Sequence, residues 1–149
     1  MESDILVKEL GKSLGIELAF DNDGVCAFMA DDMTVTIHGL PDGEIALVGD
    51  IGEPPPEGLE KLYRAMLEAN HLFGGTAGAT ISFDSERGRF SLVKLFDCRN
   101  LDSDTFMQAV SKFVSVLEMW TKLTAEWRVS PDDSRTEPDS VPPANAMLV

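Results

Sequence analysis

The sequence predicts an α+β protein built on one antiparallel, strongly twisted sheet of about five strands flanked by three helices, in the order α-βββ-α-ββ-α. Three observations predict this class. Two groups of short segments alternate apolar and polar residues, as half-buried strands do. Tight turns rich in Asp, Gly and Pro separate these segments. Before, between and after the two groups, apolar residues recur at helical spacing, which is typical of amphipathic helices.

Length and composition favour a single domain. The chain has 149 residues, of which 44% are hydrophobic, so a substantial core can form. We expect residues 1–128 to make this domain and residues 129–149, acidic and rich in Pro, to make a flexible tail. The first residues are acidic where a signal peptide would be basic, so we expect the chain to stay in the compartment where it is made.

The first predicted elements are a helix and three strands, over residues 5–14, 25–30, 33–40 and 44–51. Ser3 or Asp4 is placed to cap the helix, and Gly15 follows its end. Leu6 and Leu10 belong to a narrow apolar stripe. We therefore expect this helix to lie at the edge of the core, with part of its surface open to a partner.

Both faces of the strand predicted over residues 25–30 are apolar. Alternation places Cys26 and Phe28 on one face and Val25, Ala27 and Met29 on the other. An antiparallel strand with one solvated face normally carries polar residues on that face. We therefore expect either that both faces are covered or that the face with Val25, Ala27 and Met29 is kept for a ligand.

The second predicted helix, residues 58–70, carries more apolar surface than one sheet can cover. Counting its alanines, the apolar arc spans roughly 200° at about 100° per residue, whereas a sheet covers about 100°. A second copy of the chain is the simplest occupant of the excess surface. The residues assigned to a homodimer contact are Leu59, Leu62, Tyr63 and Met66.

A glycine-rich corner, residues 74–78, follows this helix and leads into a hairpin of strands 79–84 and 90–95. The corner lacks the Lys of a phosphate-binding loop, so crowding of the backbone is the better explanation of its glycines. Val93 and Leu95 alternate away from the core face. The last predicted helix covers the sheet over residues 105–127.

No catalytic or metal-binding pattern is found in the sequence. His38 and His71 lack ligand spacing, and Cys26 and Cys98 are isolated thiols, which we expect to be small, partly buried hydrophobes. There is also no Gly-x-Ser-x-Gly nucleophile elbow. We expect a binding protein that is not an enzyme and that uses neither a cofactor nor a metal.

The balance of acidic and basic residues limits the classes of partner that the chain can bind. Twelve Lys and Arg residues stand against 26 Asp and Glu residues, which gives a net charge of −14. Such a charge repels nucleic acid and anionic lipid, and it attracts basic partners. The chain also lacks an apolar run of about 18 residues, so we expect no membrane insertion.

The order of the elements and several short motifs resemble the Tir chaperone (CesT) family, the class I chaperones of type III secretion. The resemblance covers residues 5–127. The motifs that carry it are Leu10–Gly15, Gly24–Phe28, Leu67–Asn70, Ala79–Asp84 and a final helix that ends in Trp120 and Trp127. The proline run at residues 54–56 and the acidic tail are not part of this resemblance.

The resemblance implies a homodimer in the bacterial cytoplasm that binds the extended N-terminal segment of a secreted effector and keeps it soluble and competent for export. It also implies a contact with the secretion apparatus. The residues chosen for the partner surface are Leu6, Leu10, Val25, Ala27, Met29, Val93 and Leu95. Ordinary core packing is the alternative for each of them. The alternative function is a regulatory or stress-related module of the same fold, similar to YbjN, that binds folded proteins.

Overall fold

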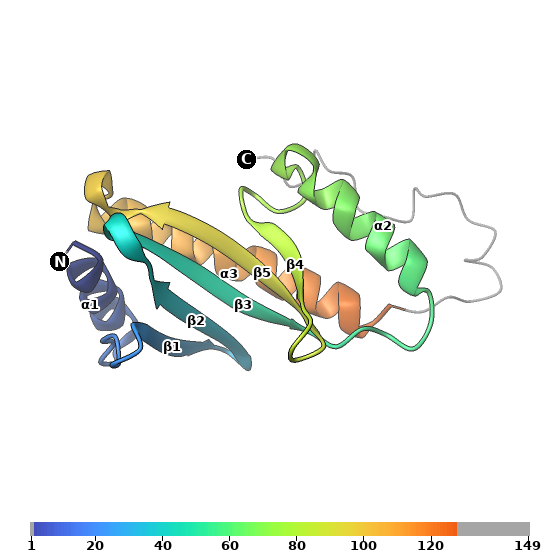
Figure 1. Ribbon diagram of the computed structural model, residues 1–149, viewed down its shortest axis with the longest axis horizontal. Coiled ribbons are helices and arrows are strands. Elements are labelled where there is room, and N and C mark those ends of the chain that lie inside the picture. Colours follow the sequence, from blue (N-terminus) through green and yellow to red (C-terminus); the bar gives the residue numbers. More distant parts are fainter. Residues whose placement is uncertain (1, 128–149) are drawn as a thin grey trace.

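The computed structural model describes residues 2–127, and the predicted tail lies outside this part of the chain. The helices are α1 (Glu2–Leu14), α2 (Leu59–Asn70) and α3 (Ser103–Ala125). The strands are β1 (Val25–Ala30), β2 (Met33–Gly39), β3 (Glu44–Gly52), β4 (Thr80–Asp84) and β5 (Arg89–Asp97). Short 3-10 helices are η1 (Pro41–Gly43), η2 (His71–Phe73) and η3 (Cys98–Asn100). The predicted fold class and element order are confirmed (Figure 1).

The strands form one antiparallel sheet in the order β1-β2-β3-β5-β4. β3 lies at the centre because every second residue of it is apolar or glycine and buried, from Ile45 to Ile51. The register pairs Leu47 with Ile37 of β2 and with Lys94 of β5. β1 and β4 are therefore the two edge strands of the sheet.

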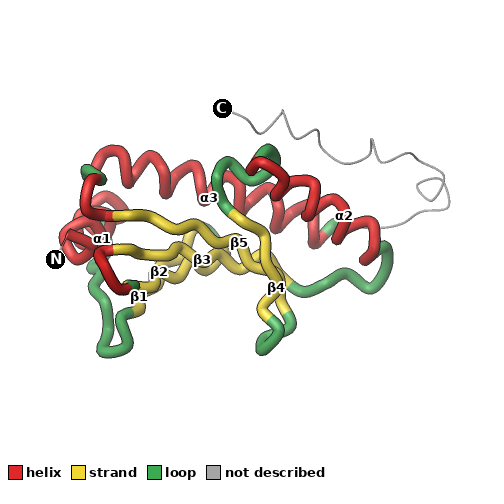
Figure 2. The backbone as a smooth tube through the Cα atoms, turned by 45° about the horizontal axis from the view of Figure 1, so that its top comes forward, coloured by secondary structure: helices red, strands yellow, loops and turns green. Residues whose placement is uncertain are grey.

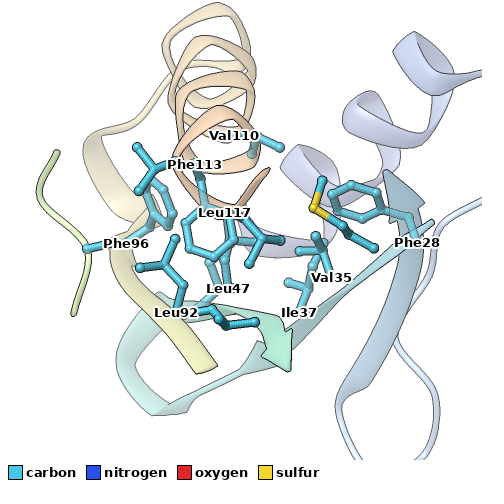
Figure 3. Packing of buried hydrophobic residues seen from close by; sticks show 14 of the residues in the cluster. Phe28, Val35, Ile37, Leu47, Leu92, Phe96, Val110, Phe113 and Leu117 are labelled. Carbon is cyan, nitrogen blue, oxygen red and sulfur yellow. The ribbon is translucent and has the colours of Figure 1, made fainter. Parts of the chain in front are cut away.

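α1 and α3 cover one face of this sheet, and Figure 2 shows α3 running along the strands. Val110, Phe113 and Leu117 of α3 point toward Leu47 and Leu92 on the sheet (Figure 3). All of these side chains are buried in one core cluster. α3 begins where Asp102 caps it, since the Asp102 carboxylate accepts a hydrogen bond from the N–H of Thr105 at 2.7 Å.

A glycine lets α3 approach the centre of the sheet closely. A Cβ atom added to Gly49 would lie 2.6 Å from Cδ2 of Leu117. Side-chain atoms do not approach that closely, so a larger residue at this position would push α3 away from β3. The glycine therefore lets α3 lie close to β3 at the centre of the sheet.

The opposite face of the sheet carries no helix within residues 2–127. Its side chains follow from the alternation and the register, and they include Val25, Ala27, Met29, Thr36, His38, Ala46, Val48, Val93 and Leu95. None of these residues is buried. The predicted division of β1 and β5 into two faces is therefore confirmed.

Two indole groups, one in the C-terminal half of α3 and one just after its end, tie α2 to this part of the chain. The indole N–H of Trp120 donates to the carbonyl of Gly75 at 3.0 Å, and that of Trp127 donates to the carbonyl of Gly58 at 2.9 Å. Gly58 and Gly75 flank α2, so the helix is held at both ends. Both tryptophans therefore pack within the protomer. No helix within residues 2–127 is long and apolar enough to cross a membrane.

Candidate functional site

The prediction that Leu6 binds a partner is wrong, whereas Leu10 lines the groove beside β1 described below, and its role as a contact stays a prediction. Their side chains are 4% and 2% exposed, inside the core cluster. Most of the narrow stripe of α1 is covered because α1 packs against α3 and η3. A partner cannot reach Leu6 without unfolding part of this core, and it can touch Leu10 only where that side chain lines the groove.

The other predicted partner-binding residues lie on the face of the sheet that has no helix. Met29 is 59% and Leu95 is 55% exposed, and Ala27 is also exposed. Val25 and Val93 are half-buried by their neighbours in the sheet. Their role as contacts to a partner stays a prediction, but their side chains are accessible.

The backbone of β1 presents unpaired hydrogen-bonding groups at the edge of the sheet. In an antiparallel strand, the N–H and C=O groups of successive residues alternate between the two sides. Those of Val25 point to the free edge, where its N–H donates to Asp21 Oδ1 at 3.0 Å and its C=O accepts from the Asp21 N–H at 2.9 Å. Ala27 and Met29 have the same orientation, and nothing within residues 2–127 hydrogen-bonds to their backbone groups on this side.

An apolar groove of about 340 Å³ adjoins this open stretch of β1. Its walls come from the end of α1, the end of β1 and the N-terminal half of α3. Leu14 is 45% exposed at the rim, Met107 and Val114 are half-buried, and Phe28 is buried at 5%. Figure 3 shows Phe28 and Val110, which both line the groove, extending from β1 and α3. A strand added to β1 would send alternate side chains toward this groove and over Met29.

A second groove, of about 630 Å³, lies between α1 and residues 16–20. It is lined by Val7, Leu18 and Phe20 together with Lys8 and Lys12. No residue of β1 lines it, so it offers no free strand edge to an extended segment. The groove beside β1 is therefore the better candidate site.

Leu14, Met107 and Val114 were not among the predicted site residues. Sequence periodicity assigns Val114 to the core stripe of α3, and Leu14 to that of α1. The width of these apolar stripes was the one signal that could have identified them. Side chains at the margin of a wide stripe are the ones that a neighbouring element leaves uncovered.

The prediction that Leu62 and Met66 make a dimer contact does not fit the structure. They are 0% and 4% exposed within the protomer, and Leu59 is half-buried. The apolar arc of α2 is wide because α2 packs against β4 and is also tied to α3 through Trp127. Of the predicted set, only Tyr63, at 43% exposure, presents a substantial surface.

A different set of large apolar side chains is exposed around α2. We call it the α2–β4 patch, and it consists of Tyr63 (43% exposed), Leu67 (70%), Leu72 (80%), Phe73 (49%) and Phe83 (49%). Tyr63 and Phe83 both contact the ring of Phe90 edge-to-face, at centroid distances of 6.0 and 5.4 Å. The ring contacts place side chains of α2 and β4 on one continuous surface.

Backbone strain supports a binding role for this patch. Leu72 and Phe73 have φ angles of 53° and 58°, in the left-handed region that bulky residues rarely adopt. Each costs about 1–2 kcal/mol relative to a right-handed conformation. This strain keeps two apolar side chains exposed to solvent, so it does not stabilise the protomer through packing. A contact with another protein that buries the two side chains is the better explanation of the strain.

Neither cysteine is placed to react. Cys98 is buried and Cys26 is half-buried, which confirms their predicted packing role. Burial, together with the negative charge of Asp21, raises the pKa of the Cys26 thiol to about 11 from 9.0.

Residues 2–127 also contain no group of three or more His, Cys, Asp and Glu side chains arranged to hold a metal ion.

We expect Cys26 to react slowly with thiol reagents such as Ellman's reagent. Only the thiolate reacts, and a pKa raised from 9.0 to about 11 lowers its fraction at pH 8 about 100-fold. The rate should then increase with pH until the pH passes the raised pKa. Labelling of a Cys98→Ser chain, native and in guanidinium chloride, measures the effect. Equal rates in the two conditions would contradict it.

Comparison with known proteins decides the family. The family model described as the Tir chaperone protein (CesT) family matches residues 5–121. The chain belongs to this family. No curated protein matches the chain. The family is that of the type III secretion chaperones, so the resemblance noted in the sequence is confirmed.

Several solved structures share the fold. The ExsC–ExsE complex matches with a TM-score of 0.71 and 20% identity, over 83% of this chain and 93% of that one. The HopA1–SchA chaperone–effector complex matches with a TM-score of 0.65 and 19% identity, over 85% and 94%. The Yersinia pestis type III secretion chaperone SycH, solved with a fragment of YscM2, matches with a TM-score of 0.62 and 18% identity, over 78% and 98%. At these identities the likeness shows the fold.

Proposed function

We propose that this chain is a cytoplasmic type III secretion chaperone that binds the extended N-terminal segment of an effector and keeps it soluble until export. The observation that carries the proposal is the open edge of β1 beside an apolar groove. Family membership supports it, because the matched family consists of chaperones. The chain acts by binding, and no step of this function requires catalysis or a cofactor.

The geometry favours an extended segment over a folded partner surface. A segment in strand conformation pairs its backbone with Ala27 and Met29, and it drops alternate side chains between Leu14, Phe28 and Val114. Each large apolar side chain buried in this way contributes about 1.5–3 kcal/mol. Two or three such side chains offset the cost of ordering the segment, which is about 2–5 kcal/mol.

The net charge of −14 also suits a chaperone that keeps an effector segment soluble. An acidic carrier keeps an aggregation-prone apolar segment in solution, since like-charged complexes repel one another. It also attracts effector segments that carry basic residues and increases the rate at which they associate.

We further propose that the chaperone is a homodimer formed through the α2–β4 patch. A twofold axis brings the same patch of each protomer together, so that Leu67, Leu72 and Phe83 become buried by their counterparts. Each dimer then presents two β1 edges, and one effector segment can engage both grooves. A contact of the loaded dimer with the secretion apparatus completes the proposal.

Co-purification followed by mass spectrometry tests the function. The tagged chain, expressed in its own bacterium under secretion-inducing conditions, is expected to recover one or a few proteins whose N-terminal segments are protease-sensitive alone and protected in the complex. Recovery of folded proteins protected outside their N-terminal segments would favour the regulatory module of YbjN type instead. Recovery of no partner under these conditions would count against both.

A further inference from the structure

The two edges of the sheet are not equally open. At β4, the edge is occupied by the side chain of Asn70, the last residue of α2. Its Oδ1 accepts from the N–H of Ile81 at 2.8 Å, and its Nδ2 donates to the C=O of the same residue at 3.0 Å. An amide side chain that satisfies both backbone groups of one residue makes the two hydrogen bonds that a neighbouring strand would make.

The rest of the β4 edge is short. By strand alternation, the backbone groups that point away from β5 belong to Ile81 and Phe83, and the N–H of Ala79 before the strand bonds to the carbonyl of Thr76 at 3.2 Å. With Ile81 occupied, only Phe83 offers unpaired groups on this side within residues 2–127. At β1, by contrast, Ala27 and Met29 are both unpaired.

The Asn70 side chain is held in place by its surroundings. A Cβ atom added to Gly75 would lie 2.5 Å from Cβ of Ala69, so the glycine corner folds tightly against the end of α2. The N–H of Gly75 donates to the carbonyl of Ala69 at 2.9 Å, and the carbonyl of Gly75 accepts from Trp120. These contacts fix the end of α2, and therefore the amide, against β4. They also confirm that the corner glycines relieve crowding.

We propose that Asn70 determines which edge of the sheet accepts an added strand: its amide substitutes for a strand at β4 and leaves β1 as the pairing edge. Asn70 is a positioning residue in this account, since it touches no partner. The closure of β4 is a property of the free chain, and only the use of β1 by an effector rests on the proposed function.

Amide hydrogen exchange with a strand-forming probe peptide tests the proposal on the full chain. Every chain in this test also carries Leu67→Glu, because the proposed dimer would otherwise cover Phe83, and wild type here refers to position 70. The probe is acetylated and amidated RFSLVKLF, a copy of residues 89–96 of β5. In the wild type, the probe is expected to slow exchange at Ala27 and Met29 and to leave Phe83 unchanged. In the Asn70→Ala chain, the Ile81 amide should exchange about tenfold faster or more without the probe, since its hydrogen bond is lost. With the probe, exchange at Ile81 and Phe83 should slow again.

Two further variants separate edge closure from general loss of stability. Asn70→Asp keeps the acceptor for the Ile81 N–H and loses the donor to its C=O, so it should fold and open the edge less than Asn70→Ala. Val116→Ala removes buried core volume while keeping the amide, since Val116 is 4% exposed on α3. It should leave Phe83 unprotected by the probe.

The result that overturns the proposal is an Ile81 amide whose exchange is unchanged by Asn70→Ala, or a Phe83 amide that the probe protects equally in the wild type and in this variant. Failure of the probe to protect Ala27 and Met29 would contradict β1 as the pairing edge and count against the proposed function, while the closure of β4 by Asn70 is judged on Ile81 and Phe83. The two claims therefore fail on different amides.

Discussion

A chain carrying Ala27→Pro is expected to fold like the wild type and to lose its co-purifying effector. The N–H of Ala27 points to the free edge, so proline removes no hydrogen bond of the sheet. It removes a donor from the edge and blocks the approach of an added strand, as prolines on natural edge strands do. We expect the recovery of partner to fall about tenfold or more, since one hydrogen bond and its neighbours are lost.

Ala27→Thr is the matched control for this variant. Threonine keeps the backbone N–H and favours a strand, and its side chain lies on the exposed face. Partner recovery per mole of chain, with thermal unfolding as a check on folding, compares the two variants. If the proline chain recovers as much partner as the threonine chain, the effector does not pair with β1.

Leu67→Glu is expected to convert the proposed dimer to monomers that remain folded. Leu67 is 70% exposed in the protomer, so a charge there costs little before association. At a twofold contact, two leucines worth about 1.5–3 kcal/mol each are lost and two like charges meet. Because about 1.4 kcal/mol corresponds to a tenfold change, the dissociation constant should increase about 100-fold or more.

Light scattering over a range of concentrations measures the change in the dissociation constant of the dimer. Two further variants serve as controls. Gln108→Glu adds the same charge on an exposed position of α3 and should leave the dimer intact. Met66→Glu places the charge in the core, at a residue 4% exposed, and should give an insoluble chain instead of a monomer. An undiminished dimer in the Leu67→Glu chain would remove α2 from the interface.

Periodicity was enough to predict most of the fold, because the alternation in β2 and β3 and the helical spacing in α3 are each produced by a single buried face. Asp102 as the helix cap and the glycine corner after α2 also follow from local chemistry. These features depend on residues close together in the chain. The order of the elements then matched one family, which the family model confirms over residues 5–121.

The candidate site was predicted only in part, since an apolar pattern shows that a side chain avoids water but not which neighbour covers it. Leu10 and Met66 appear as stripe residues on a helical wheel, and the packing of α1 on α3 and of α2 on β4 buries them. Ala27 and Met29 were chosen correctly as accessible because β1 has apolar residues on both faces. The role of Asn70 could not be predicted, since its partner, Ile81, is 11 positions away on a separate element.

The central claim is that the N-terminal segment of an effector lies in the groove between β1, α1 and α3. The most direct test is a photo-crosslinker, p-benzoylphenylalanine, at position 14 on the rim of this groove, in the full chain expressed with its co-purifying partner. The account predicts a crosslink to the N-terminal segment of the partner, and none from the same group at position 86, which is exposed in the turn between β4 and β5. A crosslink from position 14 to a folded domain of the partner, or no crosslink while the partner still co-purifies, would contradict it.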